Sequence, residues 1–177
     1  MVTAEAAERF LGSTCLPGAD AATRRELINV LDERRVAAGT LLLEQGRPND
    51  RIWFLLEGSV SVYRMVIDGH VEAVANLTGP SVFGETSFFR TVAPSVSVKA
   101  QTDLWLLTLD HDAHAVLRRA DPNAAEQLAL SAVRVLAERF DLLDRRVSEF
   151  LARHPDEPAR TDEWSSFRAR LFREASL

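Results

Sequence analysis

Two residues in the middle of the chain could bind an anion and a hydroxyl group. Gly84 and Glu85 follow Phe83 and precede two hydroxyl residues, Thr86 and Ser87. A strand that ends here and turns into a helix would expose consecutive backbone N–H groups, which form a cradle for an anion. The carboxylate of Glu85 could accept a hydrogen bond from a sugar hydroxyl. The structural alternative is that Glu85 anchors its own loop.

Other residues with reactive side chains form no pattern for catalysis or metal binding. His111 and His114 share a predicted helix, but no cysteine or further histidine lies near them to complete a metal site. Cys15 and His70 are more typical of a free thiol and a surface imidazole than of a haem site. The sequence has no Gly-x-Ser-x-Gly, Walker or dinucleotide motif. We therefore predict a protein that is not an enzyme and holds no metal.

The composition is that of a globular protein with one domain and an appendage. The 177 residues carry a formal net charge of -5, which argues against a main role in binding nucleic acid. The single cysteine fits a reducing compartment. No run of about 18 apolar residues could span a bilayer, and the N-terminus lacks a signal-peptide pattern. These features predict a cytoplasmic location.

Short apolar or alternating runs with turn residues between them fill the middle of the chain, and these runs predict strands. The predicted strands are Thr40–Glu44, Ile52–Glu57, Ser59–Ile67, Val71–Leu77, Ser95–Gln101 and Leu104–Leu109. Asp68-Gly69 is a strong hairpin signal because a tight primed turn needs positive φ at both central residues. Many short strands without intervening helices indicate an antiparallel sandwich or barrel.

Helical periodicity flanks the predicted strands. It covers residues 3–33, then a short helix over Asp110–Ala120 with Asp110 as N-cap, and a long helix from Pro122 to about Ala152. The long helix has an apolar seam at spacings of four and three, which two helices could bury between them. The seam consists of Ala129, Val133, Leu136, Phe140, Leu143, Val147 and Phe150. The alternative is that this seam packs on the barrel.

The run from about Val36 to Ala152 resembles the cyclic nucleotide-binding domain family, which includes catabolite activator-type regulators, cyclic-nucleotide-dependent kinases and gated channels. The matching segments are Ala38–Thr40, Glu44–Gly46, Asn49–Asp50, Ile52–Gly58, Asp68–Gly69, Phe83–Glu85 and Val98–Ala100. The resemblance implies a mainly β fold with flanking α, a jelly-roll-like antiparallel β-barrel with N-terminal helices and a long C-terminal helix. The expected domains are residues 1–34, 35–152 and 153–177.

The resemblance also implies a binding site for cyclic AMP or cyclic GMP. The position of Gly84 lets the backbone approach the phosphate, and that of Glu85 binds the ribose 2′-hydroxyl. The positions of Thr86, Ser87 and Ser95 lie near the phosphate.

One family residue is missing at this site. The family has an arginine nine or ten residues after the glutamate, where this chain has Pro94 and Ser95. Val96 stands where the family has a small alanine. Without its cationic partner a buried phosphodiester is unfavourable, and the lost charge-assisted bond is worth roughly 1.5–3 kcal/mol. Arg90 is the candidate replacement for the arginine, and the alternative is that it is a solvated loop residue.

The resemblance implies a homodimer through the long helix. Its expected interface residues are Val133, Leu136, Phe140, Leu143 and Val147. About 25 residues follow this helix, with five arginines and five acids, which is too short for a helix-turn-helix module, so we expect no direct DNA binding. A short amphipathic segment with Trp164 and Phe167 is expected to dock on the domain or on another protein.

Two functions are consistent with these features. The first is a regulatory ligand sensor, in which occupancy of the loop from Phe83 to Ser95 shifts a hinge near Asp121 and moves the long helix. The second is a degenerate domain that has lost its ligand and acts only in protein interaction or assembly.

Overall fold

A computed structural model describes residues 4–16, 19–66, 69–153, 163–164 and 166–167 of the chain. The chain forms two compact units, Met1–Val133 and Arg134–Leu177. The first unit contains all the described strands, and we describe it first.

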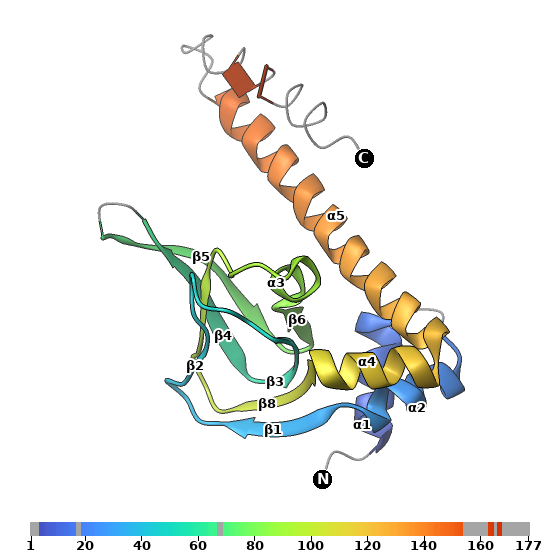
Figure 1. Ribbon diagram of the computed structural model, residues 1–177. Helices are drawn as coiled ribbons and strands as arrows, with labels where there is room; N and C mark the ends of the chain where they lie inside the picture. The colour runs from blue at the N-terminus through green and yellow to red at the C-terminus, as the bar shows by residue number, and fades with distance from the viewer. Residues whose placement is uncertain (1–3, 17–18, 67–68, 154–162, 165, 168–177) are drawn as a thin grey trace. The chain divides into compact units, whose positions relative to one another are not determined.

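Two antiparallel four-stranded sheets form the first unit (Figure 1). One sheet has the order β1 (Asp32–Val36), β8 (Leu104–Asp110), β3 (Arg51–Glu57), β6 (Ser81–Phe83). The other has the order β2 (Leu41–Leu43), β7 (Ser97–Ala100), β4 (Ser59–Met65), β5 (Val71–Thr78). This arrangement confirms the predicted mainly β jelly-roll fold. The pairing of β4 with β5 confirms the predicted hairpin, although Asp68 lies outside the described residues.

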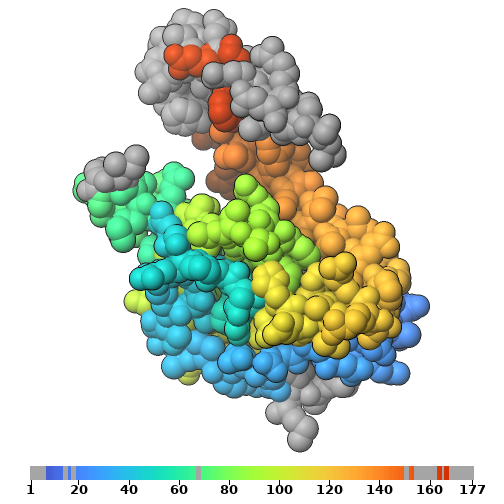
Figure 2. Space-filling view, in the orientation of Figure 1, coloured from blue at the N-terminus to red at the C-terminus, as the bar shows by residue number. Residues whose placement is uncertain are grey.

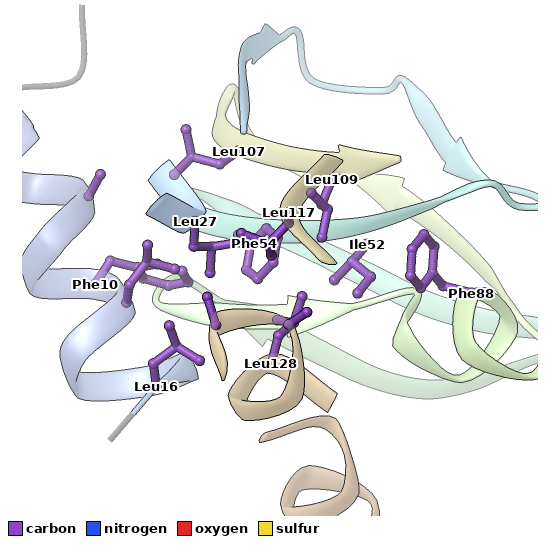
Figure 3. Close-up of a cluster of buried hydrophobic side chains, with 14 residues drawn as sticks. Phe10, Leu16, Leu27, Ile52, Phe54, Phe88, Leu107, Leu109, Leu117 and Leu128 are labelled. Carbon is purple, nitrogen blue, oxygen red and sulfur yellow. The ribbon is translucent and has the colours of Figure 1, made fainter. Parts of the chain in front are cut away.

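Strand β3 is apolar on both faces because each face lies against a different core. Ile52 and Phe54 belong to a cluster that also contains residues of the flanking helices (Figure 3). Trp53 and Leu55 point to the opposite face, where they join a second cluster with residues of both sheets. Because successive side chains of a strand alternate between its faces, one run of apolar residues supplies both cores.

The helices of the first unit are α1 (Ala4–Phe10), a π-helical turn η1 (Leu11–Cys15), α2 (Ala21–Asn29), α3 (Glu85–Arg90) and α4 (His111–Ala120). Figure 1 shows α1, α2 and α4 gathered at one side of the sheets. The Asp110 carboxylate accepts a hydrogen bond of 2.8 Å from the backbone N–H of Ala113, which confirms Asp110 as the N-cap of α4.

Helix α5 (Pro122–Arg153) follows α4 after Asp121 and extends into the second unit. Its first turns are buried in the core of the first unit through Ala124, Ala125 and Leu128. The predicted long helix is confirmed to within one residue at its C-terminal end. Of the expected terminal segment, only residues 163–164 and 166–167 are described, and there the rings of Trp164 and Phe167 stack with centroids 5.5 Å apart.

Two short strands differ from the sequence prediction. The helical prediction for residues 3–33 is wrong at its end, where β1 begins at Asp32. Four of the five β1 residues are exposed, so the strand shows no apolar alternation, and it forms by pairing with β8. The sequence does not predict strand β6 either, because its three residues are too few to show a period.

Candidate ligand-binding site

The predicted site residues lie in residues 83–95, which we call the site loop. The site loop begins where β6 ends, and there Phe83 pairs with Trp53 of β3. The next residue, Gly84, has a φ of +84°, a conformation that glycine adopts without strain. A Cβ on Gly84 would lie 2.9 Å from the Arg51 carbonyl oxygen and 3.0 Å from Cδ1 of Trp53. Both backbone conformation and space therefore require glycine here.

Glu85 begins α3 and is buried, with 2% of its surface exposed. The Thr86 hydroxyl donates to its carboxylate at 3.4 Å. Ser87 is also buried, and its hydroxyl donates to the Gly84 carbonyl oxygen at 3.1 Å. The structure therefore places Gly84, Glu85, Thr86 and Ser87 together in one turn.

Residues 44–50, between β2 and β3, hold both ends of the site loop. At its start, the side-chain amide of Asn49 donates to the Gly84 carbonyl oxygen at 3.2 Å and to the Ser87 hydroxyl at 3.0 Å. At its end, the N–H of Gly46 donates to the Pro94 carbonyl oxygen at 2.9 Å. In Figure 2 the site loop, in light green, lies at the surface beside the cyan segment that includes residues 44–50. The ends of the loop are thus fixed by protein contacts.

The position of the missing arginine is filled by an apolar residue. Pro94 is buried, whereas Ser95 is exposed. Val96 is half-buried and packs against the cluster between the two sheets. Arg90 lies in the last turn of α3 and is exposed. Ser95 and Arg90 both belong to the site loop, and both are exposed, whereas Glu85 is buried.

Arg51, the arginine at the start of β3, is already paired with an acid. Arg51 donates to both carboxylate oxygens of Asp50, at 2.8 and 3.0 Å. This contact raises the pKa of Arg51 and lowers the pKa of Asp50, since each charge stabilises the other. Arg51 also lies with its guanidinium carbon 5.7 Å from the ring centre of Trp53. The positive charge of Arg51 is therefore paired with the carboxylate of Asp50.

Aromatic contacts join α3 to α4. The rings of Phe88 and His111 are stacked, with centroids 4.2 Å apart and an interplanar angle of 13°. His114 meets Phe88 and Phe89 edge to face. Partial burial lowers the pKa of His114, and the nearby charges of Arg118 and His111 lower it further. The site loop thus contacts the helix that leads into α5.

Residues 33–121, half of the chain, match the family described as the cyclic nucleotide-binding domain. The chain belongs to this family. The match spans all eight strands except the first residue of β1, together with α3 and α4. The matched range includes the whole site loop.

Known proteins similar to this cyclic nucleotide-binding domain include regulators and channels. A CRP-like cAMP-activated global transcriptional regulator of Mycobacterium tuberculosis is 30% identical over 114 residues, which are 64% of this chain and 49% of that protein. A cyclic nucleotide-gated potassium channel of Mesorhizobium japonicum is 34% identical over 102 residues, 57% of this chain and 26% of the channel. The chain thus spans about half the length of the regulator and a quarter of the channel.

Solved structures show the same fold. The N-terminal domain of a transcriptional regulator from Streptomyces coelicolor superimposes with a TM-score of 0.65 at 27% identity, covering 76% of this chain and 94% of that domain. A cyclic nucleotide-binding domain from Methylobacillus flagellatus gives a TM-score of 0.74 at 21% identity, covering 82% and 83% of the two chains.

Among the helices that the structure describes, none combines the length and apolar character needed to cross a bilayer.

Several residues of this cyclic nucleotide-binding domain have roles that the sequence did not indicate. The sequence indicates Asn49 only as part of a segment that matches the family. Its contacts with Gly84 and Ser87 join residues that are 35 and 38 positions apart in the chain. Trp53 and His111 likewise contact the site loop only through tertiary packing.

A surface hollow lies elsewhere on this domain and contains no predicted site residue. Its lining includes Arg35 of β1, Glu57 of β3 and Trp105 of β8.

Proposed function

We propose that this chain is a non-enzymatic regulatory module that senses a small ligand of the nucleotide type. The ligand would contact Gly84, Glu85, Thr86, Ser87 and Ser95 of the site loop. The observation that carries this proposal is the buried carboxylate of Glu85, placed directly after a left-handed glycine in a domain of this family. A buried carboxylate can bind a ligand hydroxyl more strongly than an exposed one, because water competes less.

Binding of cyclic AMP or cyclic GMP would be weak. Pro94 offers no charge to a phosphate, and Arg51 is paired with Asp50. Losing a charge-assisted bond of roughly 1.5–3 kcal/mol corresponds to about 10- to 100-fold in affinity. Arg90 could supply a cation only if its exposed side chain folds back toward the start of the site loop.

A change in the site loop on ligand binding would be transmitted to α5 through its contact with α4. Phe88 of the site loop stacks on His111 in the first turn of α4. Asp121 ends α4, and its carboxylate accepts a hydrogen bond of 3.1 Å from the N–H of Ala124 in α5. Asp121 therefore belongs to the junction of the two helices, where a change in φ and ψ would redirect α5.

The exposed seam of α5 supports a homodimer. Val133 and Leu143 are 61% and 56% exposed, and Leu136 and Phe140 are each more than a third exposed. Apolar side chains at this spacing match the a and d positions of a two-helix coiled coil. We therefore extend the proposal to a dimer in which two copies of α5 bury this seam.

Calorimetric titration with cyclic AMP and cyclic GMP, up to millimolar concentration, tests the proposed function. We expect a saturable heat for the wild-type protein, with weak affinity, and no heat for Glu85→Ala. Thr102→Ala is the control, because Thr102 is exposed, lies outside the site loop and should leave the heat unchanged. Absence of heat with both cyclic nucleotides would contradict the proposal.

A second function is favoured by the contacts of Pro94. Its burial, and the hydrogen bond that its carbonyl oxygen accepts from the Gly46 N–H, fix this end of the site loop through protein contacts. A domain with such a loop could act purely in protein interaction or assembly. A protein that binds no nucleotide or nucleoside, yet still forms the α5 dimer, would support this alternative.

A further inference from the structure

The surface hollow between the ends of β1, β3 and β8 is a second place on this domain where a small ligand could bind. Its volume is about 430 Å³, which is within the range of small-molecule sites. The lining residues belong to these three strands or directly flank them, and they include Arg35, Val36, Glu57, Asp103, Leu104 and Trp105. None of the residues that line the hollow belongs to the site loop.

Strand pairing places an aromatic ring between a cation and a carboxylate in this hollow. Trp105 of β8 pairs with Arg35 of β1 on one side and with Glu57 of β3 on the other. Directly paired residues have their side chains on the same face of a sheet. The three side chains therefore form one row across the sheet, and the guanidinium carbon of Arg35 is 4.2 Å from the centre of the Trp105 ring.

The positive charge of this row is already engaged by protein groups. Nε of Arg35 lies 4.0 Å from Oε1 of Glu33, and the same oxygen accepts a hydrogen bond of 2.9 Å from the indole N–H of Trp105. The contact of the guanidinium with the ring adds a cation–π interaction. These contacts orient the ring of Trp105 and pair Arg35 with an acid, so the hollow offers little positive charge to an anionic ligand.

Two other acids of the hollow, Glu57 and Asp103, have no basic partner in the part of the chain that the structure describes. The position of Asp103 is nevertheless fixed, because its Oδ1 accepts a hydrogen bond of 2.9 Å from the Ala38 N–H. The hydroxyl of the preceding residue, Thr102, accepts a hydrogen bond of 3.0 Å from the Ser59 N–H. The hollow therefore has an excess of negative charge, and the segment that carries Asp103 is held by backbone contacts.

The remaining lining is mainly apolar. Leu104 is buried, Val36 is half-buried, and both pack in the cluster between the two sheets. The half-buried ring of Trp105 adds aromatic surface. A hydrocarbon chain can cover such surface while a charged group at its end stays in contact with water and with an acid, as the side chains of lysine and arginine do.

We propose that this hollow binds a small aliphatic diamine, a ligand with a short hydrocarbon chain and an ammonium group at each end. One ammonium group pairs with Glu57 and the other with Asp103, and the chain lies against Trp105 and the neighbouring apolar residues. The two positive charges of the ligand match the two acids that lack a basic partner. The inference goes beyond the proposed function and does not depend on it.

Calorimetric titration of the wild-type protein with cadaverine and with pentylamine tests the inference. The two probes have the same hydrocarbon chain, but pentylamine has only one ammonium group. We expect saturable binding of cadaverine to one site, and an affinity for pentylamine that is at least tenfold lower, because one of the two acids stays unpaired. Equal affinities for the two probes, or no saturable heat with cadaverine, would overturn the inference.

Removal of the two negative charges locates the site. Glu57→Gln and Asp103→Asn keep the shape of the side chains, and Asn retains the oxygen that accepts the Ala38 N–H. We expect each substitution to weaken cadaverine binding at least threefold and the double substitution to weaken it at least tenfold. If the double variant does not fold, the two single variants decide.

Glu126→Gln is the matched control for these variants. It also removes one negative charge, from an exposed acid of α5 that lies outside the hollow. We expect its affinity for cadaverine to equal that of the wild type. An equal loss in Glu126→Gln and in the variants of the hollow would show that the diamine is attracted only by the net negative charge of the protein, and the proposed site would be wrong.

A titration of cadaverine in the presence of saturating cyclic AMP separates this inference from the proposed function. We expect an unchanged affinity for cadaverine, because the hollow and the site loop share no residue. Competition between the two ligands would overturn the placement of the diamine. Failure of cadaverine to bind overturns the diamine site alone, whereas the proposed function is decided by the titrations with cyclic nucleotides.

Discussion

At the scale of single residues, Gly84 combines two demands that only glycine meets. Its φ of +84° excludes most side chains on conformational grounds, and its neighbours leave no room for a Cβ. Gly39 has a similar φ of +85°, but no atom lies within 4 Å of its Cβ position. The two glycines therefore separate the cost of the backbone conformation from the cost of a steric clash.

We predict that Gly84→Ala destabilises the protein more than Gly39→Ala does. The left-handed conformation costs roughly 1–2 kcal/mol for a residue with a Cβ, and only Gly84→Ala adds the overlap with Arg51 and Trp53. Urea unfolding of both variants measures the difference in the free energy of unfolding. Equal losses would show that the turn relaxes around the added methyl group.

His114 predicts a dependence of stability on pH. Its pKa is lower in the folded protein than its ordinary value of 6.5, chiefly because it is partly buried. The unfolded chain therefore takes up this proton more readily, and stability falls as the pH drops below about 6.5. His114→Phe keeps a ring beside Phe88 and Phe89 but cannot be protonated. Unfolding free energies between pH 7.5 and 5 should fall less steeply for His114→Phe than for wild type, and parallel curves would contradict the assignment.

At the scale of elements, the helices and strands with strong local signals agree with the sequence prediction. Three of these features are local and follow directly from the sequence. They are the N-cap at Asp110, the proline at the start of α5 and the turn before β5. Strands β1 and β6 have no such signal, and they form because β8 and β3 provide hydrogen-bonding edges. Pairing between distant segments cannot be inferred from the periodicity of one segment.

The N-cap of α4 gives a prediction at this scale. Asp110→Ala removes the acceptor of the Ala113 N–H and should cost about 1 kcal/mol of unfolding free energy. Asp112→Ala is the matched control, because Asp112 is an exposed acid in the first turn of the same helix and is not its cap. Thermal or urea unfolding measures both variants. A loss as large for Asp112→Ala would point to the helix dipole instead of the cap.

At the scale of the whole molecule, the family and the layout of the barrel could be predicted from the sequence, whereas the state of the site could not. The matching segments predict the jelly-roll-like barrel and name Glu85 as a candidate site residue. The burial of Pro94, the pairing of Arg51 with Asp50 and the clamp formed by Asn49 each depend on contacts between segments that the sequence keeps apart. The buried indole N–H of Trp53 has no hydrogen-bond acceptor within the described part of the chain, and only the three-dimensional structure shows this.

The assembly of the molecule gives a further prediction. Phe140→Glu places a charge in the middle of the α5 seam and should convert a dimer into a monomer. Arg145→Glu is the control, because residue 145 lies on the opposite side of the heptad repeat and should leave the dimer intact. Light scattering coupled to size exclusion measures both masses. A mass of Phe140→Glu equal to that of wild type would contradict the dimer through this seam.

The attachment of the site loop to residues 44–50 has a consequence for the thermodynamics of recognition. A recognition loop that is anchored at its beginning and end before the ligand arrives has few backbone conformations left to lose. The entropic penalty of ordering the protein on association is correspondingly small. A compact ligand with few polar groups can then reach measurable affinity. The domain can therefore bind such a ligand without a strong ionic contact.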